Sequence, residues 1–123
     1  MALTIDQNNI LSVTRGDTFE VPLFINQGND LKPMRYTVND KDEIYLAVMQ
    51  PDQYFENAIL KKKYTKADIN SYGDIVIRIE HDDTKCLIPG KYYYQVKGKI
   101  YNLDTDKIDV NTIIQRTEFF ITE

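Results

Sequence analysis

The sequence has no tryptophan, and it has a single cysteine, Cys86. One cysteine cannot form a disulfide within the chain, so the fold must be held by its hydrophobic core, which suits synthesis in a reducing cytoplasm. No apolar run approaches the ~18 residues that a membrane-spanning helix needs. The first residues also lack a basic segment followed by an apolar one, so we expect no secretory signal and no membrane partner.

Side chains that commonly carry catalysis are scarce. The only histidine, His81, lies next to Asp82 and Asp83 and five residues before Cys86. A catalytic site would also need a nucleophile and an orienting group in convergent geometry. A zinc site would need four ligands, which one cysteine and one histidine do not supply. We therefore interpret these residues as polar groups that cap a turn at the end of a strand.

The acidic segment near residue 106 is a candidate calcium loop, because Asp104, Asp106 and Asp109 are close in sequence. It lacks the glycine and the distal glutamate of a calcium-binding loop, so a hairpin loop is the simpler interpretation. Ser12 and Ser71 stand in no nucleophile-elbow context, and no glycine-rich phosphate loop is present. We therefore expect no enzyme activity, no metal and no cofactor.

What the chain does contain is typical of one folded domain. It has 123 residues, of which 42% are hydrophobic and 28% are charged, so disorder is not expected. Its net charge of −4, with both signs interspersed, argues against a nucleic-acid partner. The basic run from Lys61 to Lys63 is interpreted as a solvated strand edge, which charge protects from pairing with other strands. A phosphate-binding patch is the alternative.

Hydrophobic residues alternate with polar ones over short runs, which predicts strands rather than helices. Pro22 cannot donate a ladder hydrogen bond, so its strand is expected at a sheet edge or with a bulge. The last strand should place Phe119 and Ile121 in the core. The predicted strands are Phe19–Ile25, Ile44–Met49, Ile75–Glu80, Tyr92–Ile100 and Ile113–Ile121, with weaker candidates at Asn9–Thr14, Met34–Val38 and Ala58–Tyr64.

Turn-forming residues separate these runs, and one of the predicted loops covers Asn102–Asp109. Thr65 and the segment Asp82–Lys85 have the composition of helix N-caps, so we expect short helical turns there. Seven or eight short strands joined by turns predict an all-β fold, specifically an antiparallel immunoglobulin-like β-sandwich over residues 11–123. Residues 1–10 are predicted to be an N-terminal arm, either disordered or ordered on a neighbouring molecule.

Three segments carry a more specific pattern. Val13–Thr18 contains Arg-Gly-Asp-Thr, Gly73–Ile77 starts a strand with Gly-Asp, and Asp83–Val96 contains Asp-Thr followed by Pro-Gly-Lys-Tyr. The last strand then ends in Thr-Glu-Phe-Phe-Ile. This order resembles the small immunoglobulin-like domains in virion proteins of tailed bacteriophages, and most closely the N-terminal domain of baseplate upper proteins. The resemblance extends from about Val13 to Ile121.

The resemblance implies a virion structural protein, made in the bacterial host cytoplasm, that contacts other virion proteins such as capsid, neck or tail subunits in a multi-copy assembly. Baseplate upper proteins continue into a trimerising stalk, whereas this chain ends at Glu123, directly after its last predicted strand. We therefore expect a stand-alone accessory subunit, such as a head decoration protein or a neck or tail accessory protein. The alternative is a baseplate or tail-fibre adaptor, or a carbohydrate- or receptor-binding module.

Aromatic side chains are enriched at protein interfaces, so those that the alternation places off the core face are candidate contact residues. Two further aromatic residues lie in a predicted loop, where they and Asn57 would form the platform of a sugar-binding module. The alternative is that the same rings simply cover the second face of the sandwich. The predicted protein-contact residues are Tyr45, Tyr54, Phe55, Tyr93, Tyr101 and Phe120.

Overall fold

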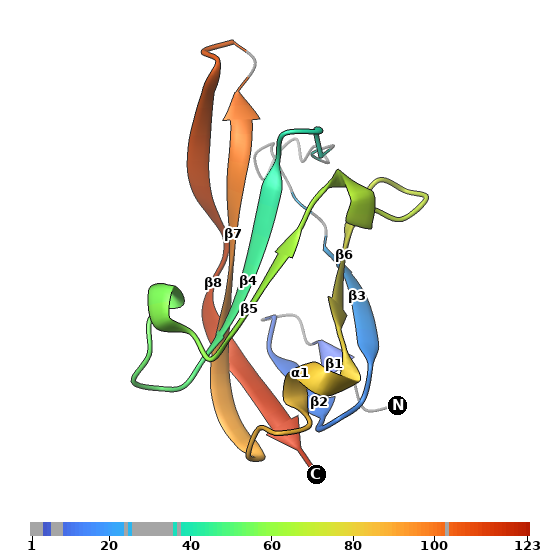
Figure 1. Ribbon diagram of the computed structural model, residues 1–123, viewed down its shortest axis with the longest axis vertical. Coiled ribbons are helices and arrows are strands. Elements are labelled where there is room, and N and C mark those ends of the chain that lie inside the picture. Colours follow the sequence, from blue (N-terminus) through green and yellow to red (C-terminus); the bar gives the residue numbers. More distant parts are fainter. Residues whose placement is uncertain (1–3, 6–8, 24, 26–35, 37, 103) are drawn as a thin grey trace.

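We describe the protein from a computed structural model, in which residues 4–5, 9–23, 25, 36, 38–102 and 104–123 are described. These residues form an all-β fold with short helical turns between some of the strands (Figure 1). The strands are β1 (Thr4–Ile5), β2 (Leu11–Thr14), β3 (Phe19–Leu23), β4 (Glu43–Met49), β5 (Leu60–Tyr64), β6 (Ile75–Ile79), β7 (Gly90–Asn102) and β8 (Lys107–Thr122).

The strands form two sheets. One has six strands in the order β1-β2-β8-β7-β4-β5, and the other consists of β3 and β6. The larger sheet curls like half of a barrel, and the smaller sheet lies beside it (Figure 1). Neighbouring strands are antiparallel, except that β2 runs parallel to β8, which differs from the antiparallel prediction. No hairpin joins β2 to β8, so chain connectivity does not fix their relative direction.

The core lies between the two sheets. Alternate residues of β4 and β6, such as Ile44 and Ile77, are buried, and β7 and β8 contribute Tyr94 and Phe119. The rings of Tyr94 and Phe119 meet edge to face, with centroids 6.0 Å apart. Gly98 is also required by this packing, because a Cβ atom at that position would lie 3.0–3.2 Å from three isoleucine side chains. The core is therefore tightly packed along β7.

The predicted strands with the clearest alternation are confirmed. The larger sheet contains β4 between β7 and β5, as expected for a strand with apolar residues on both faces. Pro22 lies in β3, which pairs only with β6 among the described strands, so its edge position is confirmed. Phe119 and Ile121 are buried as predicted. The basic run Lys61–Lys63 lies in β5, at the edge of the sheet.

The predicted loop Asn102–Asp109 is wrong in extent. β7 continues to Asn102 and β8 begins at Lys107, so the two strands pair up to Asn102 and Lys107. Of the described residues, only 104–106 lie in the turn between the two strands. The polar composition suggested a long loop, but the hydrogen-bonded ladder with β7 extends the strand. Of the weaker candidates, Met34–Val38 lies mostly outside the described residues, whereas the strands β2 and β5 are present.

The helical elements are short. They are η1 (Phe55–Asn57), η2 (Lys66–Asp68) and α1 (His81–Thr84), and within the described residues no helix is long and apolar enough to cross a membrane. Thr65 caps η2 as predicted. The N-cap predicted within Asp82–Lys85 is wrong, because α1 starts earlier, with Glu80 as its N-cap. Asp83 instead accepts a hydrogen bond from the Glu80 amide at 2.7 Å, the reach-back contact of a capping box.

Candidate functional site

The face of the larger sheet that points away from the core is the candidate site. Even-numbered residues of β4 and β7 face the core, so the odd-numbered ones point to the opposite side of the sheet, where Ala47 and Met49 are nevertheless fully buried. The strand register sets Tyr45 between Lys63 of β5 and Lys97 of β7, and it sets Met49 beside Tyr93. We call this surface the outer face. Its aromatic and charged members on β4, β5 and β7 are Glu43, Tyr45, Lys61, Lys63, Lys91, Tyr93, Lys97 and Lys99.

Cationic groups lie over the aromatic rings of this face. The Lys99 ammonium is 5.5 Å from the centre of the Tyr45 ring. The Arg116 guanidinium, from the neighbouring strand β8, is 4.6 Å from the centre of the Tyr93 ring, and Lys91 is 5.5 Å from it. Each such contact is worth about 0.5–1 kcal/mol at an exposed site. The half-buried rings of Tyr45 and Tyr93 therefore orient these cations on the outer face.

The loop after β4 folds back over this face. Phe55, in η1, is half-buried, with Lys97 at 4.7 Å and Lys61 at 5.9 Å from its ring centre. Arg116 holds the start of the loop, because it donates hydrogen bonds to the carbonyl oxygens of Gln53 at 2.8 Å and Pro51 at 3.1 Å. The loop therefore brings a further aromatic ring into the same cationic surroundings.

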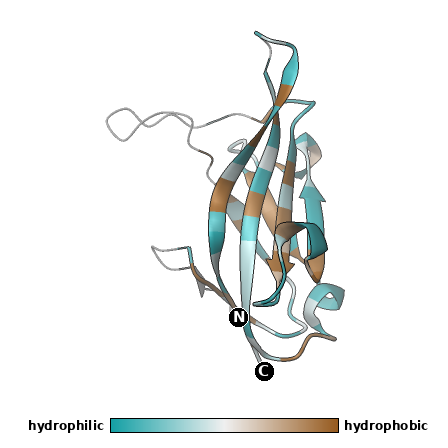
Figure 2. Ribbon diagram, turned by 90° about the vertical axis from the view of Figure 1, so that its left-hand side faces the viewer, coloured by the Kyte–Doolittle hydropathy of each residue, from teal (hydrophilic) through white to brown (hydrophobic). Residues whose placement is uncertain are grey.

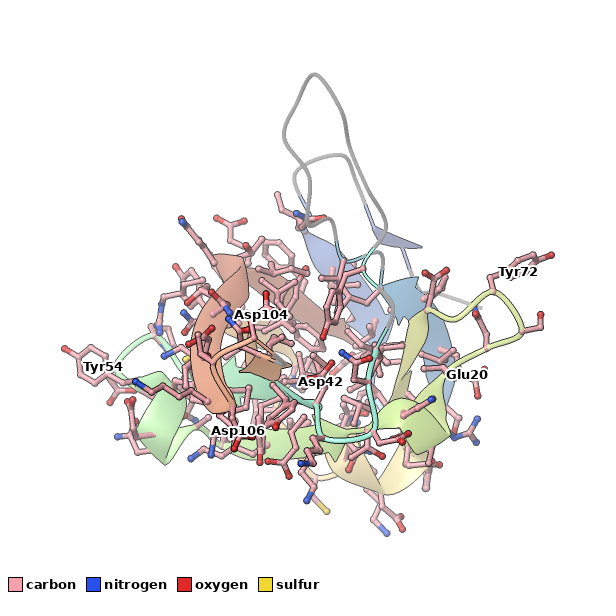
Figure 3. The ribbon with its side chains drawn as sticks, turned by 90° about the horizontal axis from the view of Figure 1, so that it is seen from above. Glu20, Asp42, Tyr54, Tyr72, Asp104 and Asp106 are labelled. Carbon is pink, nitrogen blue, oxygen red and sulfur yellow. The ribbon has the colours of Figure 1, made fainter. Side chains whose placement is uncertain are left out.

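The structure brings together only some of the predicted contact residues. Tyr45, Phe55 and Tyr93 lie on or against the outer face, and each has a cation beside its ring. Tyr54 is 74% exposed and points away from the body of the molecule, on the side opposite Tyr72 (Figure 3).

Tyr101 and Phe120 lie at opposite ends of the β7–β8 pair, and Phe120 is the ladder neighbour of Lys91 of the outer face. Tyr101 is close to the hairpin turn, with the Lys41 ammonium 4.3 Å from its ring centre and its hydroxyl bonded to Asp106. Phe120 pairs with Lys91 near the end of β8 and is half-buried.

The outer face carries an excess of positive charge, although the chain as a whole is acidic. Lys63 is paired with Glu43 at 3.3 Å, and this hydrogen bond is the main reason that the pKa of Glu43 is lowered. Lys91 is paired with Glu118 at 3.2 Å, which raises the pKa of Lys91. Within the described chain, Lys97 and Lys99 lie in no ion pair. The predicted contact residues include the rings but not these cations, although the odd positions of Lys97 and Lys99 in the Tyr92–Ile100 run indicated that they face outward.

The end of the β7–β8 hairpin has the opposite character. This turn projects beyond the rest of the larger sheet (Figure 1), and Figure 2 shows that its end is hydrophilic. Asp104, Asp106 and Asp109 are exposed there, together with Lys107. In the part of the chain that the structure describes, none of these carboxylates forms an ion pair, and no cluster of three potential metal ligands occurs. The tip therefore presents unneutralised negative charge to solvent.

A buried carboxylate anchors the base of this hairpin. Asp42 is fully buried, and its Oδ1 accepts a hydrogen bond from the Tyr101 amide at 2.8 Å. Its Oδ2 accepts hydrogen bonds from the Asn39 amide at 2.9 Å and from the Tyr36 hydroxyl. Burial and this carboxylate both raise the pKa of Tyr36. Since every contact is made to a neighbouring backbone or side-chain donor, Asp42 has a structural role.

Two of the sequence segments that carry the phage resemblance meet at one corner. The buried Thr84 hydroxyl accepts a hydrogen bond from the Gly16 amide at 2.8 Å. The His81 ring contacts the Gly16 carbonyl through Nδ1, and the His81 amide donates to Thr18 at 3.2 Å. Gly16 has a φ of +80°, a conformation that favours glycine. His81 is thus engaged in holding the corner, and Cys86 is exposed nearby in sequence without a disulfide.

The same corner continues into β7. The Tyr92 hydroxyl donates a 2.6 Å hydrogen bond to the carbonyl of Ile88, four residues upstream. Asp83 also forms an ion pair with Lys62 of β5. The Lys62 Nζ to Asp83 Oδ2 distance is 2.7 Å, and both side chains are about one-fifth exposed. These contacts tie the Asp-Thr and Pro-Gly-Lys-Tyr elements into the fold.

Comparisons of the chain with protein-family models, with curated proteins and with solved structures found no match. The interpretation of the outer face therefore depends on its own geometry and charge.

Proposed function

We propose that this protein is a non-enzymatic accessory subunit of a tailed-bacteriophage virion that acts by protein–protein contact through its outer face. The observation that carries the proposal is the grouping of Tyr45, Phe55 and Tyr93 among cations on one accessible sheet face. Aromatic and arginine side chains are the groups that contribute most to protein interfaces. The subunit is a head decoration protein or a neck or tail accessory protein, made in the host cytoplasm and carried in the virion.

The strand order supports an immunoglobulin-like sandwich as the finer description of the fold. β2, β8, β7, β4 and β5 are consecutive in one sheet, and β3 and β6 form the other. The Tyr92 hydroxyl bonded to a carbonyl just upstream resembles the tyrosine corner of such domains. The contact between Gly16 and Thr84 gives a physical reason for two segments of the phage-like pattern to occur together.

A multi-copy arrangement fits the modest strength of the individual contacts. Each cation–aromatic contact on the exposed face contributes little alone, but a repeated lattice multiplies weak contacts into stable attachment. The partners in this proposal are capsid, neck or tail subunits, with no nucleic acid and no membrane involved.

The test is loading of the purified protein onto particles produced without it. We expect Tyr45→Ala combined with Tyr93→Ala to reduce loading at least about tenfold, because both rings leave the outer face. The matched control is Tyr72→Ala, which removes an equally large ring that is 77% exposed on another side of the molecule. If the double variant loads as well as wild type and keeps its fold by circular dichroism, the proposal is refuted.

A carbohydrate- or receptor-binding module is the second candidate, and one observation favours it. Tyr54 and Arg116 line a hollow of about 250 Å³ beside the loop after β4. Against it, the Asn57 side chain already accepts a hydrogen bond from the Tyr54 amide at 2.7 Å. Glycan-array screening with an oligomerised form tests this candidate, and an array without binding removes it. Immunogold labelling of particles distinguishes a baseplate or tail-fibre adaptor from a head protein, because it shows where on the particle the protein is bound.

A further inference from the structure

The outer face carries an excess of positive charge and the tip of the β7–β8 hairpin an excess of negative charge, and one molecule cannot fold its tip onto its own outer face. We infer that the tip of one copy docks on the outer face of a second copy, so that the protein assembles head to tail. This inference depends on the proposed function, since it names a partner for the same surface.

The charges on both surfaces are available for such a contact. Lys97 and Lys99 form no ion pair among the described residues, although Lys99 lies opposite Glu43 in the ladder, and both point outward from β7. Glu43 and Glu118 are outnumbered on this face by Lys61, Lys63, Lys91, Lys97, Lys99 and Arg116. At the tip, Asp104, Asp106 and Asp109 outnumber Lys107, so the turn is net negative. Figure 3, which looks down on the tip, shows Asp104 and Asp106 at the end of the hairpin.

Apolar groups accompany the charges. Ile108 is 58% exposed and Val110 is 64% exposed, both on β8 immediately after the tip. Val110 lies opposite Lys99 and Ile108 lies opposite Tyr101 in the ladder, so both apolar side chains are on the outward side of the sheet, between the acidic turn and the lysines. An exposed apolar pair on a projecting hairpin indicates a contact surface, because burying such groups on a partner is favourable.

The partner must be another molecule. β7 belongs both to the outer face and to the hairpin, so the tip extends along the same sheet and cannot fold back onto that sheet's own face. Because the two complementary surfaces lie at different places on one chain, the contact is heterologous. Contacts of this kind generate closed rings or open filaments, depending on the rotation between neighbours.

Sedimentation velocity of the purified full chain at increasing concentration tests the inference. In low salt we expect the weight-average mass to rise with concentration. The rise should disappear at about 1 M salt, where the Debye length is about 3 Å. The face variant, Lys97→Glu with Lys99→Glu, should weaken association at least about tenfold. The tip variant, Asp104→Lys with Asp109→Lys, should do the same; Asp106 is left in place because its φ is +52°.

Mixing the two variants provides the decisive measurement. The tip variant keeps a normal face for the acidic tip of the face variant, and its basic tip matches the reversed face. An equimolar mixture should therefore associate more strongly than either variant alone. The matched control is Lys66→Glu with Lys85→Glu, the same charge change on exposed lysines away from the outer face, which should leave association unchanged.

Three outcomes overturn the inference: wild type that stays monomeric, charge variants that associate like wild type, and a mixture that shows no recovery. Binding of the outer face to single-stranded DNA, used as a polyanion probe, without self-association overturns it as well. The failures of the two proposals are distinguishable. A monomeric protein whose loading on particles still depends on Tyr45 and Tyr93 refutes only self-association. Self-association that persists when the ring variant loads normally refutes only the virion contact.

Discussion

Replacing Asp42 with asparagine should destabilise the fold far more than its place in a polar turn suggests. The side chain is fully buried, and its two oxygens accept hydrogen bonds from the amides of Asn39 and Tyr101 and from the Tyr36 hydroxyl. Asparagine has nearly the same shape but only one acceptor oxygen. In either orientation of the amide, its NH₂ group faces a backbone N–H that has lost its acceptor.

The magnitude follows from the hydrogen bonds that change. A buried donor left without an acceptor costs about 1–3 kcal/mol, and bonds to a neutral oxygen are each weaker by about 1 kcal/mol than bonds to a carboxylate. The neutral side chain recovers part of the cost of burying a charge. We therefore expect Asp42→Asn to lower the free energy of unfolding by about 2–3 kcal/mol, a large part of the roughly 5–15 kcal/mol typical of a domain.

Urea unfolding followed by circular dichroism measures this effect. Asp40→Asn is the matched control, because Asp40 lies in the same turn but its side chain is 86% exposed and forms only a surface ion pair with Lys66. The control should change stability by at most about 0.5 kcal/mol. If both variants unfold at the same urea concentration, the assignment of a structural role to Asp42 is incorrect.

Two further predictions concern buried hydroxyls. Thr84→Val should lower the free energy of unfolding by about 1–3 kcal/mol and accelerate hydrogen exchange at the Gly16 amide. Thr84→Ser keeps the hydroxyl, so it should keep that amide protected. Unchanged exchange in the valine variant would contradict the contact between Thr84 and Gly16. Burial raises the pKa of Tyr64, whose hydroxyl donates to the Arg78 carbonyl at 3.0 Å. A raised pKa favours the protonated folded state, so this contribution is present below about pH 10 and is lost above it, by up to about 1.4 kcal/mol per pH unit. Tyr64→Phe should make the fall of the free energy of unfolding with rising pH shallower, and the part of that fall that comes from Tyr36 should remain. If urea unfolding between pH 9 and 11 gives the same slope for the variant and wild type, this prediction is refuted.

Much of the fold could be predicted from the sequence, because alternation reports directly on burial. Ile44 and Ile77 belong to runs in which every second residue faces the core, and both runs are strands. The extent of the β7–β8 hairpin could not be predicted in this way. Ile108 and Val110 alternate with Asp109 and Asn111, but this run is short and follows directly on the turn-forming residues Asn102–Asp106, so the local composition indicated a loop. Pairing with β7, which local composition does not report, makes it a strand.

The candidate site was predictable only in part. The odd positions of Tyr45 and Tyr93 predicted outward-facing rings, and both rings do face outward. The odd positions of Lys97 and Lys99 indicate outward-facing lysines, but which cation lies beside which ring depends on strand register and on the path of the loop, which local sequence does not encode. Lys61 and Lys97, for example, are distant in sequence and meet at Phe55 only because β5 and β7 flank β4. The burial of Asp42 is likewise a consequence of tertiary packing.

The parallel pairing of β2 with β8 has a consequence for how the chain folds. Thr122 bonds to the carbonyl of Val13, 109 residues away, and the Arg15 amide donates to the Thr122 carbonyl at 2.8 Å. Closing so long a loop costs entropy before the contact returns any stabilisation, which slows folding. During synthesis the β7–β8 hairpin can form locally, whereas β2 must wait with an unpaired edge until residues 119–122 have been made. Completion of the larger sheet is therefore the step at which a newly made chain is most exposed to mispairing.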